Sequence, residues 1–380
     1  MIPYGKQNIS DQDINAVIDV LKSPYLTQGS CVPLFEEKLC DYTKAKFCSV
    51  MNSATSALHL AYLALGVGKG DIVWTSPITF VATSNAALMC DAIVDFVDID
   101  SDTLNMSVES LKTKLEIASK NNELPKVVTP VHMCGQSCDM AEIYELSKQY
   151  GFKIIEDASH AVGGEYLETK VGSCKYSDIA IFSFHPVKII TTAEGGALLT
   201  NNQEIDRKVK LLRTHGVTKE SLQRETEGSW YYEQHELGYN YRMTELQASL
   251  GVTQIERLNE FIDKRNLIAD KYISFFKENA IDFVKVNEDR KSSYHLFIIK
   301  VDPVRRKSIF ENFHNKDIGV QIHYFPVHKQ PYYEALREYS DLYNAEKVYE
   351  EIISIPMYPM LTDDEIKYIC ETTSELIQDK

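Results

Sequence analysis

Short apolar runs rich in β-branched residues alternate with amphipathic stretches between about residues 50 and 200. The runs have the length of buried strands, and the stretches between them repeat apolar residues at helical spacing. This alternation is typical of βα units that build a mainly parallel sheet. The expected strands lie at residues 71–76, 92–97, 127–132, 153–157, 179–184 and 197–200, and the expected helices at 56–65, 108–118 and 140–150.

The second half of the chain has a different pattern. A polar and aromatic stretch at 216–236 predicts a long loop, and a helical pattern follows from residue 244 to about 278. We therefore expect an α/β fold with a large domain at 1–245 and, at 246–380, a linking helix with a small C-terminal α+β domain. The small domain is expected to contain strands at 294–301 and 320–324 and helices at 305–315 and 363–378, the last capped by Thr362.

Composition narrows the class of protein. The chain has 380 residues, of which 44% are hydrophobic, enough for one large core and a smaller second one. Its net charge is −15 and its basic residues are scattered, which disfavours binding to nucleic acid or to an anionic membrane. No apolar run approaches the roughly 18 residues of a membrane span, and the first residues do not resemble a signal peptide, so we expect a cytoplasmic protein.

The eight cysteines mostly lie in apolar segments, which predicts free thiols rather than disulfides. One cluster could indicate zinc, because His132, Cys134 and Cys138 place soft ligands close together in HMCGQSC. A structural zinc site usually needs a second pair of ligands elsewhere, and the remaining cysteines are isolated. We therefore favour buried thiols and expect no metal.

A lysine follows an expected strand in FSFHPVK, where Pro186 ends the strand and Lys188 lies on the loop. Residues just past the carboxyl end of a strand in an α/β domain border the usual ligand crevice. Desolvation there would lower the pKa of the amine and make it nucleophilic. A lone loop lysine is otherwise an ordinary surface charge.

Two further features point to the same crevice. Asp157 closes the expected strand KIIED, where its carboxylate could hold a proton on a pyridine nitrogen or simply cap the next helix. The small residues of NSATS, at 52–56, open a helix whose first backbone N–H groups could bind a phosphate. An ordinary helix cap would look similar, so each feature alone is weak.

The order of the three features is more specific than any one of them. A helix-start phosphate site, then Asp157, then Lys188 resembles the order in the fold-type I enzymes that use pyridoxal 5′-phosphate (PLP), whose fold is like that of aspartate aminotransferase. The segments NSATSALHLA, SPITFVATSNA, EDASHAVGG, FSFHPVKIITTAEGGALLTNN and GYNYRMTELQASLG are similar to the DegT/DnrJ/EryC1/StrS family of sugar aminotransferases. The resemblance covers nearly the whole chain.

This resemblance implies roles for individual residues. Lys188 would be the Schiff-base lysine and the proton carrier, and Asp157 would pair with the pyridinium nitrogen. The active site would span two chains of a homodimer, because Asn240 would reach the cofactor phosphate of the neighbouring subunit. The remaining cofactor contacts would be Phe80 on the ring face, the N–H groups of Ala54 and Thr55 and the hydroxyl of Ser183 on the phosphate, and His160 on the 3-oxygen.

The resemblance also implies the substrates. Glutamate would convert PLP to pyridoxamine 5′-phosphate (PMP), which would then aminate a nucleotide-linked keto sugar. The LTQG loop at 26–29, FHPVKIITTAEGG and HYFPVHKQPYY look most like family members that aminate C4 of UDP-2-acetamido-2,6-dideoxy-β-L-arabino-hex-4-ulose, a UDP-linked 4-keto-6-deoxy-N-acetyl hexose, in pseudaminic acid biosynthesis. Candidates for sugar-nucleotide binding, each of which could instead be a packing residue, are Tyr4, Gln28, His185, His323 and Tyr324.

Three alternatives remain open at this stage. The chain could aminate another nucleotide-linked 3- or 4-keto sugar with the same catalytic set. It could be a PLP-dependent sugar dehydratase, although related dehydratases carry histidine in place of the lysine that is present here as Lys188. It could also be a non-catalytic relative that binds a sugar nucleotide, but such a protein would be expected to lose Lys188 or Asp157.

Overall fold

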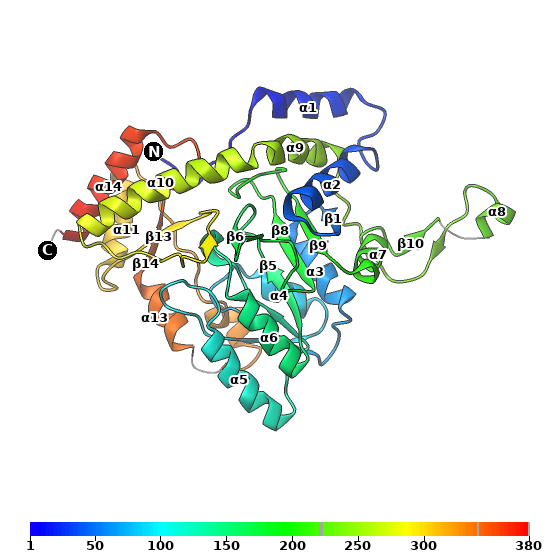
Figure 1. Ribbon diagram of the computed structural model, residues 1–380, viewed down its shortest axis with the longest axis horizontal. Coiled ribbons are helices and arrows are strands. Elements are labelled where there is room, and N and C mark those ends of the chain that lie inside the picture. Colours follow the sequence, from blue (N-terminus) through cyan, green and yellow to red (C-terminus); the bar gives the residue numbers. More distant parts are fainter. Residues whose placement is uncertain (220–222, 340–341, 379–380) are drawn as a thin grey trace.

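The large part of the protein is built on one seven-stranded sheet. The computed structural model describes residues 1–219, 223–339 and 342–378 (Figure 1). Four of the strand pairings in this sheet are parallel, and the strand β9 runs antiparallel to both of its neighbours. The strand order is β1 (Phe47–Met51), β9 (Gly196–Thr200), β8 (Ile179–Ser183), β5 (Lys153–Asp157), β4 (Val127–Thr129), β2 (Ile72–Thr75) and β3 (Ile93–Phe96).

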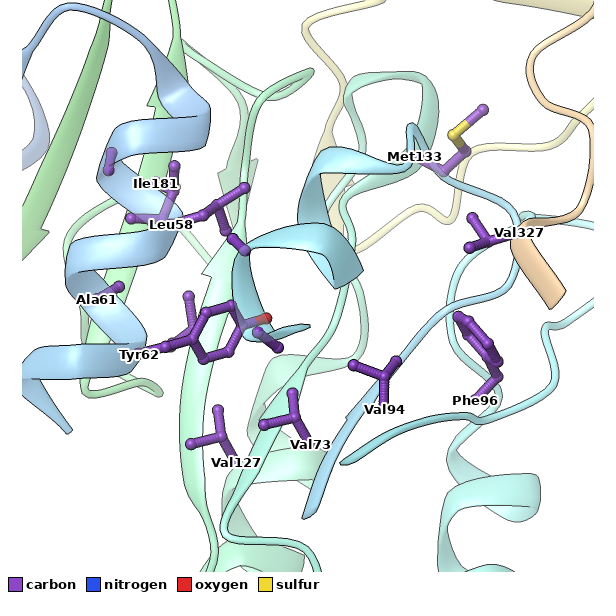
Figure 2. Packing of buried hydrophobic residues seen from close by; sticks show 14 of the residues in the cluster. Leu58, Ala61, Tyr62, Val73, Val94, Phe96, Val127, Met133, Ile181 and Val327 are labelled. Carbon is purple, nitrogen blue, oxygen red and sulfur yellow. The ribbon is translucent and has the colours of Figure 1, made fainter. Parts of the chain in front are cut away.

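Apolar residues cover both faces of this sheet. On one face, Leu58 and Tyr62 of α3 pack with Val73, Val127 and other strand residues, as Figure 2 shows. The next residues along the strands, such as Trp74 and Val128, point to the other face and pack with α5 and α6. This double burial explains why the strands are nearly continuous apolar runs. The helices of this part are α3 (Ala54–Ala64), α4 (Ala82–Leu88), α5 (Val108–Asn121), α6 (Met140–Tyr150) and α7 (Gln203–Leu212).

Long helices connect the two ends of the molecule. The helix pattern expected at 244–278 is divided at Arg257 into α9 (Glu245–Glu256) and α10 (Leu258–Glu278), because Arg257 has non-helical backbone angles of −99° and 2°. The N-terminal helices α1 (Asp11–Lys22) and α2 (Cys31–Thr43) pack against α9. In Figure 1, α10 extends from the large sheet to the C-terminal elements.

The C-terminal part is a small α+β unit, as expected. Its strands β13 (Phe297–Lys300) and β14 (Ile352–Ile355) pair antiparallel, and their apolar residues pack with α10, α11 (Arg306–Asn315) and α14 (Asp363–Gln378). Thr362 caps α14 by accepting a hydrogen bond from the backbone N–H of Glu365. The other elements are β6 (Glu165–Tyr166), β7 (Thr169–Lys170), β10 (Val217–Thr218), α8 (Gln223–Glu227), β11 (Glu233–Gln234), β12 (Arg290–Lys291), α12 (Pro331–Glu334), α13 (Tyr343–Glu351) and the 3₁₀ turns Met133–Gly135 and Val327–Lys329.

One expectation for this part was wrong, and one strand is shorter than expected. Residues 320–324 form no strand; a single bridge joins Gln321 to Ser354. The strand expected at 294–301 begins only at Phe297, because Tyr294 has a positive φ of 45° that breaks the extended chain. The domain division at 245 and 246 stays an interpretation, since Leu296 of the C-terminal part packs in the same apolar cluster as Leu58.

No helix in the described part of the chain is long and apolar enough to cross a membrane.

Candidate active site

Asp157 is the last residue of β5 and lies in the middle of the sheet. Its side chain is buried, and both carboxylate oxygens have fixed partners. Oδ2 accepts a hydrogen bond of 2.6 Å from the hydroxyl of Thr83 on α4, and Oδ1 accepts one of 3.1 Å from the backbone N–H of Ser159. Because hydrogen bonds from two sides fix its orientation, the carboxylate can pair with a cation or a protonated ring without rearranging.

Lys188 lies in the loop that follows β8, the strand next to β5. Its backbone N–H donates to the carbonyl oxygen of His185 at 2.9 Å, which forms a tight turn. Desolvation lowers the pKa of the Lys188 amine to about 8, while the charge of Asp157 acts in the opposite direction. Part of the side chain still reaches the surface. An amine of this kind is available both as a nucleophile and as a proton carrier near neutral pH.

Three buried histidines, His160, His295 and His323, lie near the Lys188 amine. Nε2 of His295 lies 3.5 Å from Nζ of Lys188, and the ring centroids of His295 and His160 are 4.3 Å apart. Burial lowers the pKa of each of these histidines, and that of His323 falls to about 3. The positive charge of Lys188 adds to this effect in all three cases. The histidines are therefore neutral and can act as hydrogen-bond donors or acceptors.

The N-terminus of α3 lies against the edge of β9. Ser53 caps the helix, and its hydroxyl accepts a hydrogen bond from the backbone N–H of Ser56 at 3.1 Å. Gly196 approaches so closely that a Cβ atom there would lie 2.4 Å from the backbone nitrogen of Ala54. Ser183 pairs with Gly196 in the sheet, so its position is close to the same helix start. The first N–H groups of a helix have no partner within the helix and favour an anion.

Aromatic residues from three separate segments form one side of the site. Phe80 is 60% exposed, and its ring centroid lies 6.2 Å from that of Tyr324. The hydroxyl of Tyr324 is 3.2 Å from Nε2 of His160. The rings of Tyr4 and His323 are 5.4 Å apart, which adds the N-terminal segment to the cluster. An exposed phenylalanine beside this polar cluster offers a flat apolar surface to a ligand.

The remaining residues singled out in the sequence lie around this cluster. Gln28 and His185 are exposed, and within the described residues neither side chain has a hydrogen bond or ring contact with the cluster. Asn240 is also exposed, and its backbone oxygen lies 3.5 Å from the side-chain nitrogen of Asn52. The segment around Asn240 is thereby held next to the start of α3. Thr55 is the second residue of that helix and is partly buried.

Sequence reasoning missed Thr83 and His295. Thr83 belongs to the SPITFVATSNA segment, but a threonine in a helix start looks like many others. His295 lies just before strand β13, and the sequence pattern does not distinguish it from a residue of that strand. The only available signal was its position in SSYHLF, after two serines and an aromatic residue.

His132, Cys134 and Cys138, the residues considered as zinc ligands, are buried in the protein interior. Nε2 of His132 lies 2.7 Å from a carboxylate oxygen of Glu156, and its Nδ1 accepts a hydrogen bond from the backbone N–H of Cys138. Both ring nitrogens are thus engaged in the protein interior. The thiol of Cys138 donates to the carbonyl oxygen of Val131, and burial raises the pKa of the Cys134 thiol.

A mainly parallel sheet with a carboxylate and a lysine at neighbouring strand ends, beside a helix N-terminus, defines the class of the fold-type I PLP-dependent transferases. Within that class, the chain belongs to the DegT/DnrJ/EryC1/StrS aminotransferase family, whose sequence profile matches residues 7–374. The expected fold class and the expected aminotransferase activity are thereby confirmed.

Individual relatives match the chain over its whole length. A UDP-4-amino-4,6-dideoxy-N-acetyl-β-L-altrosamine transaminase of Campylobacter jejuni is 41% identical over 382 residues, which cover 100% of this chain and 98% of that protein. The structure is similar to that of Helicobacter pylori PseC, an aminotransferase involved in the biosynthesis of pseudaminic acid, with a TM-score of 0.91, 32% identity and 99% of each chain covered. It is equally similar to the PMP form of Spr1654 from Streptococcus pneumoniae, with a TM-score of 0.91, 29% identity and coverage of 100% and 99%.

Proposed function

We propose that this aminotransferase transfers an amino group from glutamate to C4 of a UDP-linked 4-keto-6-deoxy-N-acetyl hexose, as a step toward pseudaminic acid. The observation that carries the proposal is the full-length identity of 41% to a transaminase named for that amino sugar, in a chain that keeps both Lys188 and Asp157. Amination of another nucleotide-linked keto sugar would use the same residues, so the nucleotide and the sugar are the part to be tested.

The residues of the site fit PLP. Nδ1 of His160 is buried and has no hydrogen-bond partner within the described residues. The helix start of α3, with Gly196 against Ala54, leaves backbone N–H groups for a phosphate. Asp157 is a buried carboxylate with fixed orientation, and Lys188 is an amine of lowered pKa. Anion site, carboxylate and amine are the groups that the phosphate, the ring nitrogen and the aldehyde of PLP need.

Each residue then has a defined task. Lys188 would hold the cofactor through Nζ, Asp157 would pair with the ring nitrogen, and Phe80 would offer its flat ring to the cofactor. When bound, PLP supplies an electron-accepting ring that carries the amino group from donor to acceptor. The N–H groups of Ala54 and Thr55 and the hydroxyl of Ser183 would bind the phosphate, and His160 would bind the ring 3-oxygen.

Lys188 also moves protons. With a pKa of about 8, its amine can both accept and donate a proton near neutral pH without a large energetic cost. Asp157 lies at the end of the neighbouring strand, and its negative charge favours the protonated form of the amine. The alternative of a sugar dehydratase is disfavoured because a lysine stands at this position.

The sugar nucleotide is proposed to bind beside Phe80, over Tyr4, His323 and Tyr324. These rings form a partly open aromatic wall next to Lys188, whereas Gln28 and His185 would contact the substrate only from exposed loops. Nδ1 of His323 is 2.8 Å from the hydroxyl of Ser354, so one ring nitrogen is already used for positioning.

We further propose a homodimer in which Asn240 reaches the cofactor phosphate of the second copy. In support, Asn240 is exposed, and the segment with β10 and α8 projects from the body of the protein (Figure 1). Trp230, Tyr232 and Leu237 of the same segment are 61–78% exposed and could be covered by a second copy.

The test combines cofactor trapping with product analysis. Purified protein is mixed with PLP, reduced with borohydride and digested, and the modified lysine is located by mass spectrometry. We expect modification of Lys188, and a change of the visible spectrum when glutamate is added before reduction. UDP- and dTDP-linked 4-keto sugars are then compared as acceptors. Absence of the Lys188 adduct, or a spectrum that glutamate leaves unchanged, contradicts the proposal and favours a dehydratase or a binding protein.

A further inference from the structure

His295 has no task in the proposed function, yet it is the histidine nearest to the Lys188 amine. Its side chain is 4% exposed, and its Nε2 lies 3.5 Å from Nζ of Lys188. Its ring packs against that of His160, with centroids 4.3 Å apart. It therefore touches one residue proposed to hold the cofactor covalently and another proposed to bind its 3-oxygen.

The backbone around His295 is held in an unusual conformation. Tyr294 has a positive φ of 45°, which a residue with a side chain adopts only when its surroundings require it. Gly135 lies so close that a Cβ atom there would be 2.5 Å from Oγ of Ser293 and 3.0 Å from the backbone nitrogen of His295. The hydroxyl of Ser293 donates to the carbonyl oxygen of His160 at 2.8 Å. These contacts fix the imidazole of His295 next to His160 and Lys188.

Burial, with a smaller contribution from nearby positive charge, keeps the His295 ring neutral. Desolvation and the positive charge of Lys188 lower the pKa of His295 well below its usual range, and His160, Arg265 and His323 contribute in the same direction. Arg265 is 1% exposed, and one of its terminal nitrogens donates to the carbonyl oxygens of Tyr294 and Met357 at 2.9 Å each. The positive charge of this buried guanidinium is one of the causes that lower the pKa of His295.

A neutral imidazole beside a protonated amine can accept a hydrogen bond from it. Lysine only donates hydrogen bonds while it is charged, and a neutral histidine has one acceptor nitrogen. With its proton on Nδ1, His295 offers Nε2 as the acceptor to the Lys188 amine. The negative charge of Asp157, at the end of the neighbouring strand, also favours the protonated amine.

We infer that His295 is a positioning residue for Lys188, whose Nε2 accepts a hydrogen bond from the lysine amine and holds that amine in the site whenever it is not bonded to the cofactor. The inference rests on the proposed role of Lys188. In this interpretation, the backbone turn at Tyr294 positions the imidazole of His295, and the charge of Arg265 helps to keep it neutral, so that it can accept a hydrogen bond from the lysine.

The test uses the full-length protein without cofactor. The pKa of Lys188 is measured from the pH dependence of its acylation by a small amine reagent, read for this one residue by mass spectrometry. His295→Leu removes the acceptor, and the pKa of Lys188 is expected to fall by about one pH unit, because a hydrogen bond to a charged group is lost. His295→Gln can place an oxygen near the position of Nε2 and is expected to retain most of the wild-type value.

Two further variants separate positioning from packing. His295→Asn keeps a polar side chain that is too short to reach the amine, so the pKa of Lys188 should fall in this variant as well. It serves as the test if His295→Leu does not fold. His328→Leu removes a buried histidine that pairs with Glu346 at 3.0 Å, and it should leave the pKa of Lys188 unchanged. Equal pKa values of Lys188 in wild type, His295→Asn and His295→Gln would overturn the inference.

Failure of this inference can be distinguished from failure of the proposed function. If wild-type protein forms no Lys188 adduct with PLP, the proposed function fails whatever the acylation shows. If the adduct forms but the His295 variants titrate like wild type, only the role of His295 is wrong.

Discussion

The hydroxyl of Thr83 donates a hydrogen bond of 2.6 Å to Oδ2 of Asp157 and so ties helix α4 to the end of strand β5. The backbone oxygen of Thr83 in turn accepts a hydrogen bond from the hydroxyl of Tyr62 on α3 at 3.1 Å. Three elements that meet at one face of the sheet thus orient a single carboxylate. A charge that is fixed before the ligand binds does not have to be reordered afterwards.

Replacement of Thr83 by valine should therefore weaken cofactor binding. The side chain keeps its shape, but the carboxylate of Asp157 loses a hydrogen bond worth about 1.5–3 kcal/mol. We expect the Kd for PLP to rise about tenfold or more, measured by equilibrium titration of the cofactor absorbance. Thr373→Val is the matched control, because Thr373 is equally buried in α14 and its hydroxyl donates to the carbonyl oxygen of Ile369 in its own helix. An unchanged Kd for Thr83→Val would mean that Ser159 alone orients Asp157.

The capture of PLP by Lys188 should depend on pH with a midpoint of about 8. Only the free amine is nucleophilic, so the rate of capture should rise as pH approaches 8 and level off above it. An exposed lysine would continue to gain reactivity up to about pH 10.4. Stopped-flow absorbance of PLP with the cofactor-free protein gives the profile, and Nα-acetyl-lysine serves as the exposed reference. A profile that parallels this reference would show that the Lys188 amine is not desolvated.

The same pKa shift has a consequence for stability. The folded protein binds fewer protons at Lys188 than the unfolded chain between pH 8 and about 10.4. The contribution of this residue to the free energy of unfolding therefore rises with pH through that window and is unfavourable below it. Lys188→Met, which keeps the length without the charge, should unfold at a higher temperature than wild type at pH 7 and show a smaller difference at pH 10. If the difference in unfolding temperature grew with pH, the pKa of Lys188 would have to be raised in the folded protein, not lowered.

The sequence predicts the position of a site residue well when neighbouring residues determine it, and poorly when contacts between distant segments determine it. The bounds predicted for α6 and β5 agree with the structure at both ends. Gly151 marks the end of α6, where it has a φ of 82°, and β5 follows shortly after it and ends at Asp157. Local signals decide both boundaries. His295 is placed instead by the turn at Tyr294 and by the close approach of Gly135, which lie far apart in the sequence. No pattern within one segment reports such a contact.

Gly196→Ala should affect the phosphate site more than the core. A Cβ atom at Gly196 would lie 2.4 Å and 2.5 Å from the nitrogen and Cα of Ala54, so the start of α3 must move away from β9. We expect a loss of stability of about 1–3 kcal/mol and a clear loss of affinity for PLP and for free phosphate. Gly68→Ala is the control, since a Cβ atom there has no neighbour within 4 Å. Phosphate affinity that equals wild type in a folded Gly196→Ala protein would place the phosphate elsewhere.

Phe80 allows binding to be separated from stability. Because its ring is 60% exposed, Phe80→Ala should change the free energy of unfolding by no more than about 0.5 kcal/mol. If the ring stacks on the cofactor, the same change should raise the Kd for PLP about tenfold, and Phe80→Tyr should restore binding. Ile117→Ala on α5, where the side chain is 56% exposed, should alter neither quantity. An alanine variant that binds PLP like wild type would remove Phe80 from the cofactor site. One that unfolds much more readily would show that its ring is needed for packing against Tyr324.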